Sequence, residues 1–139
     1  MRTTLMKLTA AAATVVAAIG LAAAPANAAG PVDVPFSMAY GASTSSGKIH
    51  FTVGYSASVT GLVHATSSPK QVCAAGFNGN LDTGIQCSAY AYPGSGNVGF
   101  TFPMTISARG GVSTVEIVMY DSTRDLVAVQ CTRSGCVPD

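Results

Sequence analysis

The chain contains no tryptophan, and only 9% of its 139 residues are charged. Beyond residue 28 it carries two lysines and three arginines against five aspartates and a single glutamate, which leaves a net charge of −1 with neutral histidines. A protein that binds nucleic acid through the release of counterions needs a basic surface, and this composition provides none. We therefore predict no nucleic-acid partner.

The chain also lacks a second long apolar run, so the one at its amino terminus is distinctive. Two basic residues precede an apolar stretch from Leu8 to about Ala24, and Ala26-Asn27-Ala28 follows as a small-x-small cleavage pattern. The run is rich in alanine and therefore only weakly apolar, which argues against a retained membrane anchor. We predict a signal peptide over 1–28 and a secreted domain over 29–139, with no membrane association after cleavage. The alanine-rich signal suggests a bacterial source.

Helix-favouring residues are scarce after residue 28, and apolar residues instead alternate with a period of two, which is typical of half-buried strands. The residues that share one face in three such runs are Ile49, Phe51 and Val53; Val98, Phe100 and Phe102; and Val115, Ile117 and Met119. We expect seven or eight strands, near 32–40, 48–55, 58–65, 71–75, 85–92, 98–107, 113–120 and 126–131. Strands at this spacing predict an all-β antiparallel sandwich.

Turn-forming stretches rich in Gly, Pro, Asn, Asp and Ser separate these runs, because such residues favour the backbone dihedral angles of turns. They lie at 41–47, 67–70, 76–80, 93–97, 108–111 and 120–125. Pro103 falls inside a predicted strand, where it cannot donate a hydrogen bond to a neighbouring strand. It therefore predicts an edge strand or a bulge.

Four cysteines, Cys73, Cys87, Cys131 and Cys136, all follow the predicted signal peptide. An oxidising compartment favours disulfides, and four cysteines allow three pairings. We favour the sequential pairing, Cys73–Cys87 and Cys131–Cys136, because each pair is close in sequence and brackets turn residues. Structural zinc usually needs ligand pairs two to four residues apart, and a redox pair favours Cys-x-x-Cys at a helix terminus. Cys73 and Cys87 lie too far apart for a zinc pair, and only Cys131 and Cys136 come near that spacing. Four intervening residues and the absence of a predicted helix argue against a redox pair. We predict no metal and no cofactor.

The segments around these cysteines resemble the neocarzinostatin-type apochromoproteins of actinobacteria. The resemblance lies in VCAAGFNGNLDTGIQC, which contains Cys-Ala and Asp-Thr-Gly before its second cysteine, and in DSTRDLVAVQCTRSGC. It covers about half of the predicted mature chain, and the first loop is longer here. The resemblance implies a secreted, immunoglobulin-like sandwich of about seven strands with two short-range disulfides. It also implies a cleft that carries a small antibiotic chromophore.

Three groups of residues raise the question of catalysis. Asp82-Thr83-Gly84 spells the aspartic-protease motif, but that chemistry needs two carboxylates, so we interpret it as a turn with Gly84 at a positive φ. His50 and His64 lie on the polar sides of predicted strands, and no Gly-x-Ser-x-Gly elbow accompanies them. Glu116 would need a facing aspartate to hydrolyse glycosides. We predict no catalytic residue and no enzyme activity; a secreted hydrolase remains the least favoured reading.

The remaining candidates are aromatic residues and loops. Tyr90 and Tyr92 share one face of a predicted strand, and Phe100 and Phe102 share a face of the next. If these strands pair, one set of rings belongs to the core and the other forms an exposed platform, and core packing is the favoured role of the rings. We predict a binding protein with Tyr90, Tyr92, Phe77 and Arg133 as candidate contacts. The partner is either a small apolar molecule or an extracellular protein. In the second case an inhibitor would present a disulfide-rigidified loop, at 76–84 or at 132–135 with Arg133 exposed.

Overall fold

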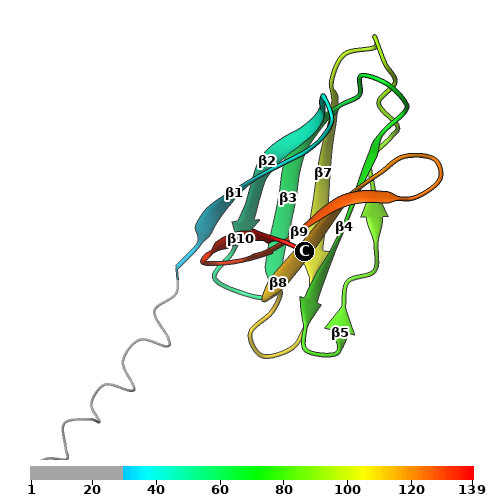
Figure 1. Cartoon of the computed structure of the whole chain (residues 1–139). Coiled ribbons are helices and arrows are strands. Elements are labelled where there is room, and N and C mark those ends of the chain that lie inside the picture. Colours follow the sequence, from blue (N-terminus) through cyan, green and yellow to red (C-terminus); the bar gives the residue numbers. More distant parts are fainter. Residues whose placement is uncertain (1–29) are drawn as a thin grey trace, which may run out of the picture. The chain divides into compact units, whose positions relative to one another are not determined.

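The computed structural model describes residues 30–139, and the domain formed by 31–139 consists of two antiparallel sheets packed face to face, without a helix in that range (Figure 1). The predicted signal peptide over 1–28 lies outside the described residues. No helix long and apolar enough to cross a membrane occurs between residues 30 and 139.

The smaller sheet contains four strands in the order β1-β2-β3-β7. Their bounds are β1 (Val32–Tyr40), β2 (Ser43–Phe51), β3 (Ser56–His64) and β7 (Val98–Thr105). Pro103 lies in β7, at the edge of this sheet, as the missing N–H group predicted.

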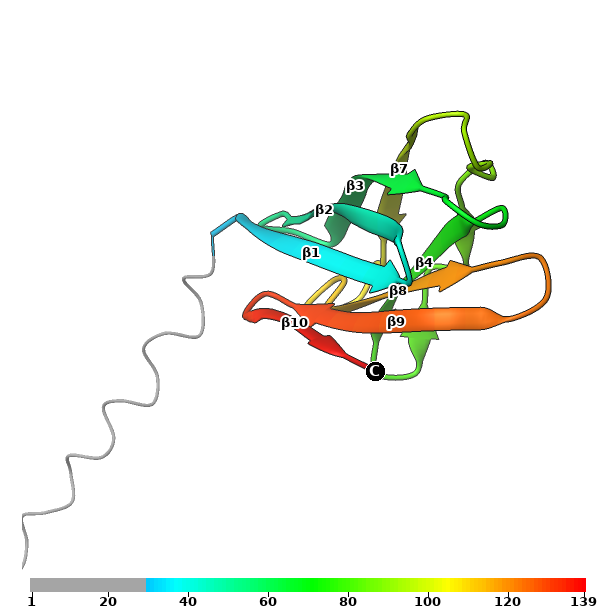
Figure 2. The same ribbon diagram turned by 45° about the horizontal axis from the view of Figure 1, so that its top comes forward.

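The larger sheet has the order β10-β9-β8-β4-β5, and β6 also pairs with β4. Its strands are β4 (Gln71–Asn78), β5 (Leu81–Asp82), β6 (Gln86–Cys87), β8 (Thr114–Tyr120), β9 (Asp125–Thr132) and β10 (Gly135–Pro138). β1 of the smaller sheet lies alongside β9 (Figure 2), and the Sγ of Cys136 lies 3.5 Å from the carbonyl oxygen of Pro35. The expected sandwich of about seven strands is confirmed: seven strands have 7–9 residues and the other three are short.

The core lies between the sheets, and seven of the nine residues named from the period-two alternation belong to it. Ile49, Phe51, Val115, Ile117 and Met119 have no exposed surface. The prediction for Val53 was wrong: β2 ends at Phe51, so this side chain is 69% exposed.

The predictions for two segments, 41–47 and 85–92, were also wrong, because hydrogen bonds made by serine side chains shape the backbone there. The segment 41–47 was expected to be a turn, yet β2 begins at Ser43; the Ser43 hydroxyl bonds that of Thr66 at 3.1 Å, and Ser45 donates to the Leu62 carbonyl at 2.9 Å. These bonds satisfy hydroxyl groups that are buried.

The predicted strand over 85–92 contains only the two residues of β6 and a bridge between Ala91 and Lys70. The Ser88 hydroxyl accepts a hydrogen bond from the N–H group of Val72, while the Ser88 N–H group donates to the Val72 carbonyl. The Ser88 hydroxyl thus accepts a hydrogen bond that a backbone carbonyl would accept in a regular strand pair, and β6 ends at the preceding residue, Cys87.

Two phenylalanines pack over a glycine in the middle of the smaller sheet. A Cβ atom added to Gly61 would lie 2.9 Å from Cζ of Phe100, 3.1 Å from Cζ of Phe36 and 2.6 Å from the Ser46 carbonyl oxygen. Glycine is therefore required here so that the two rings can approach the backbone and fill the core.

We predict that Gly61→Ala destabilises the domain by about 1–3 kcal/mol, because the methyl group forces the rings and strands apart. Gly54→Ala is the matched control, since a Cβ atom there would meet nothing within 4 Å. Urea unfolding followed by circular dichroism measures both. Equal unfolding midpoints for the two variants would contradict the packing argument.

Candidate functional site

Both disulfides have the predicted pairing, Cys73–Cys87 and Cys131–Cys136, and no described cysteine is free. Cys73 on β4 lies directly opposite Cys87 on β6, and Cys131 on β9 opposite Cys136 on β10. The sulfurs therefore link neighbouring strands of the larger sheet, and no thiolate is left over to bind zinc.

The outer face of the larger sheet provides the floor of a groove. Along β4, Val72 and Ala74 belong to the core, so Cys73, Ala75 and Phe77 face outwards by the alternation of the strand. Along β8, the core residues Val115, Ile117 and Met119 leave Glu116, Val118 and Tyr120 on the same outer face. Register pairs Cys73 with Val118 and Ala75 with Glu116, which brings the two outer rows side by side.

The segment that connects β5 to β6 is fastened over this floor. The backbones of Thr83 and Gly76 are joined by a Thr83 N–H to Gly76 C=O bond of 3.0 Å, and the Thr83 hydroxyl accepts the Gly76 N–H at 3.0 Å. Together with the Cys73–Cys87 bond, these contacts hold the connecting segment against β4. They place Ile85, which is 70% exposed, beside the outer face.

The Asp82-Thr83-Gly84 motif forms the turn that the sequence predicted. Gly84 has a φ of +78°, and its N–H group donates to the Asp82 carboxylate at 2.8 Å. The carboxylate therefore closes a turn by bonding the backbone two residues further on.

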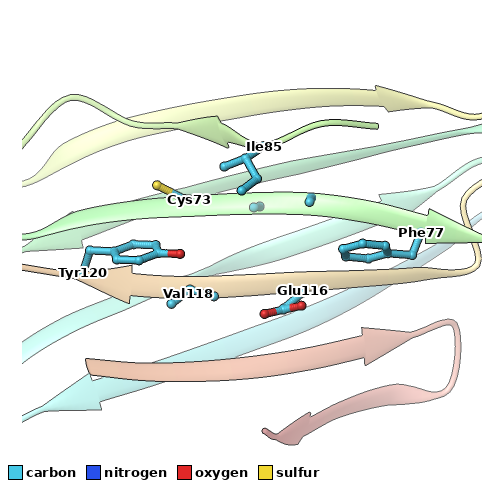
Figure 3. Close-up of a pocket in the computed structure, with 8 residues that line it drawn as sticks. Cys73, Phe77, Ile85, Glu116, Val118 and Tyr120 are labelled. Carbon is cyan, nitrogen blue, oxygen red and sulfur yellow. The ribbon is translucent and has the colours of Figure 1, made fainter. Parts of the chain in front are cut away.

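The resulting depression, which we call the β4–β8 groove, has a volume of about 70 Å³. It is lined by Cys73, Ala74, Ala75, Phe77, Ile85, Glu116, Val118 and Tyr120. Figure 3 shows the Phe77 and Tyr120 rings at opposite ends, both directed towards the middle, with Ile85 across from Glu116 and Val118. A second, more polar depression of about 300 Å³ adjoins it and shares Phe77 and Glu116. A narrow apolar slot thus opens into a wider polar space.

The charged side chain that lines the groove is the negative carboxylate of Glu116. Glu116 is partly buried, and no hydrogen bond or ion pair joins its carboxylate to any residue in 30–139. The pKa of Tyr120 is raised, first by burial and then by the negative charges of Asp125 and Glu116, so the phenol is neutral at physiological pH.

The four candidate contacts from the sequence are not brought together. Phe77 lies at one end of the β4–β8 groove. Tyr90 and Tyr92 lie next to each other, with ring centroids 6.4 Å apart, on the irregular segment between β6 and β7, and Tyr92 is 56% exposed. Phe100 and Phe102 are stacked in the core with centroids 5.0 Å apart, whereas Tyr90 is partly buried. The two aromatic segments do not pair with each other, because β6 pairs with β4 and β7 with β3.

Arg133 was expected to be exposed, but its side chain does not project into solvent. It is partly buried, its guanidinium lies 5.6 Å from the centroid of the Phe51 ring, and it donates to the Thr52 carbonyl. These contacts pack the β9–β10 turn onto the end of β2. A binding role for Arg133, Tyr90 and Tyr92 stays a prediction.

Glu116, Val118, Tyr120 and Ile85 were missed as a group. The signal was present for three of them, since the alternation that sends Val115, Ile117 and Met119 to the core sends Glu116, Val118 and Tyr120 outwards. Ile85 had no such signal, because its place depends on a disulfide and on a turn.

A second polar cluster lies on the outer face of the smaller sheet. The Asp33 carboxylate accepts hydrogen bonds of 2.6 Å from Lys48 Nζ and from the ring Nδ1 of His50. All three side chains are well exposed, as expected for His50, whereas His64 is partly buried. No group of three or more metal-ligating side chains occurs in residues 30–139.

No protein-family model matches the chain, and searches of curated proteins and of solved structures found no match either. The site is therefore interpreted from its own geometry.

We predict that replacing Cys73 and Cys87 together by alanine costs about 3 kcal/mol, because the bond closes the longer loop, with a sequence separation of 14. The matched control replaces Cys131 and Cys136, whose separation is 5, and is expected to cost about 2 kcal/mol. Chemical denaturation measures both. Only the first variant should also perturb the amide resonances of 76–87, and unchanged resonances there would contradict the role given to this disulfide.

We predict that Asp33 makes stability depend on acid pH. Its pKa is lowered from the ordinary value of 3.8 by the hydrogen bonds of Lys48 and then His50, so the unfolded chain takes up the proton more readily. The contribution is therefore present above pH 3.8 and is lost as the pH falls through the lower folded-state value. Urea midpoints of wild type and Asp33→Asn should converge over that interval; parallel curves would show that Asp33 has no such role.

Proposed function

We propose that residues 29–139 form a secreted, non-enzymatic binding domain that holds a small, largely apolar molecule in the β4–β8 groove. The observation that carries this proposal is the groove itself: an apolar floor of Cys73, Ala75 and Val118 between two aromatic rings, beneath a segment fastened by a disulfide. Small-molecule sites are typically concave and apolar with few polar groups, and a preformed site loses little entropy on binding.

The resemblance to neocarzinostatin-type apochromoproteins supports the same reading. It falls on the segment that contains Cys73, Asp82-Thr83-Gly84 and Cys87, which here forms one side of the groove. In that family the short-disulfide loop lines the cleft that holds the chromophore. We therefore propose an antibiotic-type chromophore as the natural cargo. Two disulfides are compatible with an extracellular location, and the signal-like amino terminus supports export.

A protein-interaction module is the second candidate, and one observation favours it. Leu81 and Ile85, on the disulfide-fastened segment between β4 and β6, are both mostly exposed. A rigid loop with apolar side chains is a suitable element for an inhibitor of an extracellular enzyme. The other candidate loop, 132–135, is less suited because Arg133 packs against Phe51.

We predict that a neutral flat aromatic molecule binds the groove. Tryptophol is a convenient probe, because the protein contains no tryptophan and the indole fluorescence therefore reports only the ligand. Ala75→Phe should weaken tryptophol binding about tenfold, because the added ring fills the floor of the groove. A tenfold loss of affinity corresponds to about 1.4 kcal/mol, which lies within the typical cost of a steric clash of about 1–3 kcal/mol. The matched control is Ala39→Phe, at an exposed position of β1 in the other sheet.

Amide chemical shifts in a tryptophol titration locate the site. The proposal is overturned if tryptophol leaves the resonances of β4 and β8 unchanged, or if Ala75→Phe binds it as well as Ala39→Phe does. Mass spectrometry of the protein purified from its culture medium then reports the mature start and any retained cargo.

A further inference from the structure

We propose that the molecule bound in the β4–β8 groove carries a positive charge, which the Glu116 carboxylate neutralises. This inference rests on the proposed function, and it names the chemical class of the ligand: a flat apolar ring system bearing an ammonium or guanidinium group.

Glu116 is the only glutamate of the chain, and among residues 30–139 it is the only carboxylate that lines the groove or the depression beside it. It projects from the middle of β8, between Ala75 on β4 and Gln130 on β9. Its immediate surroundings on the floor are apolar, and it is partly removed from water. A carboxylate in such a position loses hydration and gains no protein hydrogen bond in return, which is unfavourable unless a cation compensates.

The domain supplies no such cation. None of the five basic side chains in the described part lines either depression. Four of them have partners elsewhere: Lys48 bonds Asp33, Lys70 bonds Ser68, Arg124 bonds the Tyr40 hydroxyl and Arg133 bonds the Thr52 carbonyl. Within residues 30–139 no cation is left to pair with Glu116, so we assign that role to a cation of the ligand.

The aromatic rings at the two ends of the groove strengthen the same preference. Phe77 and Tyr120 both turn towards the space beside Glu116 (Figure 3), and the face of an aromatic ring attracts a cation. The pKa of Tyr120 is raised first by burial, and then by Asp125 and Glu116, whose negative charges also disfavour a phenolate there. An anionic ligand would meet unfavourable charge from the Glu116 carboxylate, so the site selects against it.

Glu116 is suited to hold a charge and not to catalyse hydrolysis. A glycosidase needs two facing carboxylates, and no second carboxylate from residues 30–139 lines the groove. The carboxylate also lies where the apolar slot meets the wider polar depression. A ring seated on the Cys73–Cys87 disulfide and Val118 would thus direct a cationic substituent towards Glu116, with the rest of the molecule in the wider space.

Three indole probes of nearly equal size test this proposal: tryptamine, tryptophol and indole-3-acetate. At neutral pH they are cationic, neutral and anionic, since an aliphatic amine is protonated and a carboxylic acid is ionised. The wild-type domain should bind tryptamine about three- to tenfold more tightly than tryptophol, as expected for one partly exposed charge pair, and indole-3-acetate more weakly than both. Indole fluorescence and amide chemical shifts provide the affinities.

Glu116→Gln is the decisive variant, because it keeps the size of the side chain and removes its charge. It should bind tryptophol as wild type does and lose the preference for tryptamine. Asp125→Asn is the matched control, because Asp125 is the other negative charge near Tyr120 but does not line the groove. This variant should retain the preference for tryptamine.

The outcomes separate this inference from the proposed function. If tryptophol binds at the groove and tryptamine binds equally well, the ligand class is wrong and the binding function stands. A preference for tryptamine that persists in Glu116→Gln, or one that disappears in Asp125→Asn, also overturns the role of Glu116. If none of the probes shifts the resonances of β4 and β8, the proposed function itself fails.

Discussion

The covalent bond between Cys73 and Cys87 is the constraint on which the groove depends. Between the end of β4 and the start of β7 the chain forms only two-residue strands, which by themselves have little to hold them in place. The disulfide fixes this segment to β4, and the Thr83 side chain satisfies the Gly76 N–H group within the same loop. Without these contacts the outer face of the larger sheet would be an open, flat surface and not a groove with Ile85 at its side.

The inner faces of β4 and β8 pack into the core, whereas their outer faces line the groove. The inner side chains are buried in the core, and Val72, Ile117 and Met119 among them have no exposed surface. The outer row is also largely apolar, and its members Cys73, Ala75 and Val118 are only 5%, 7% and 8% exposed, so this part of the row is already mostly covered. A sheet that is apolar on both faces lowers the solubility of the protein unless its second face is covered by other residues or by a ligand. Under the proposed function, a ligand in the β4–β8 groove would cover the part of the outer row that remains exposed, and the carboxylate of Glu116 would give that ligand a preferred charge.

The two sheets also differ in what their outer faces display. The smaller sheet shows an exposed polar cluster around Asp33, in which every charge has a partner within the cluster. The larger sheet shows an apolar strip with one unpaired carboxylate. Paired charges on an exposed face interact mainly with one another and with water, whereas an unpaired charge beside an apolar floor is available to an incoming molecule. This contrast is why the site is assigned to the larger sheet.

The sequence by itself determined the all-β architecture, the core and the two disulfides. Period-two alternation is a local property that places Ile49, Phe51 and Val115 in the core whatever the neighbouring strands are, and cysteines close in sequence have few alternative partners. It also placed Phe77 among the candidate contacts, but it could not join it to Glu116, Val118 and Tyr120. Only the tertiary structure decided that, because the register between β4 and β8 and the position of Ile85 depend on contacts between segments far apart along the chain. For the same reason Arg133 could not be placed: its partner, the Phe51 ring, is 82 positions away and adjoins it only after the sheets have packed.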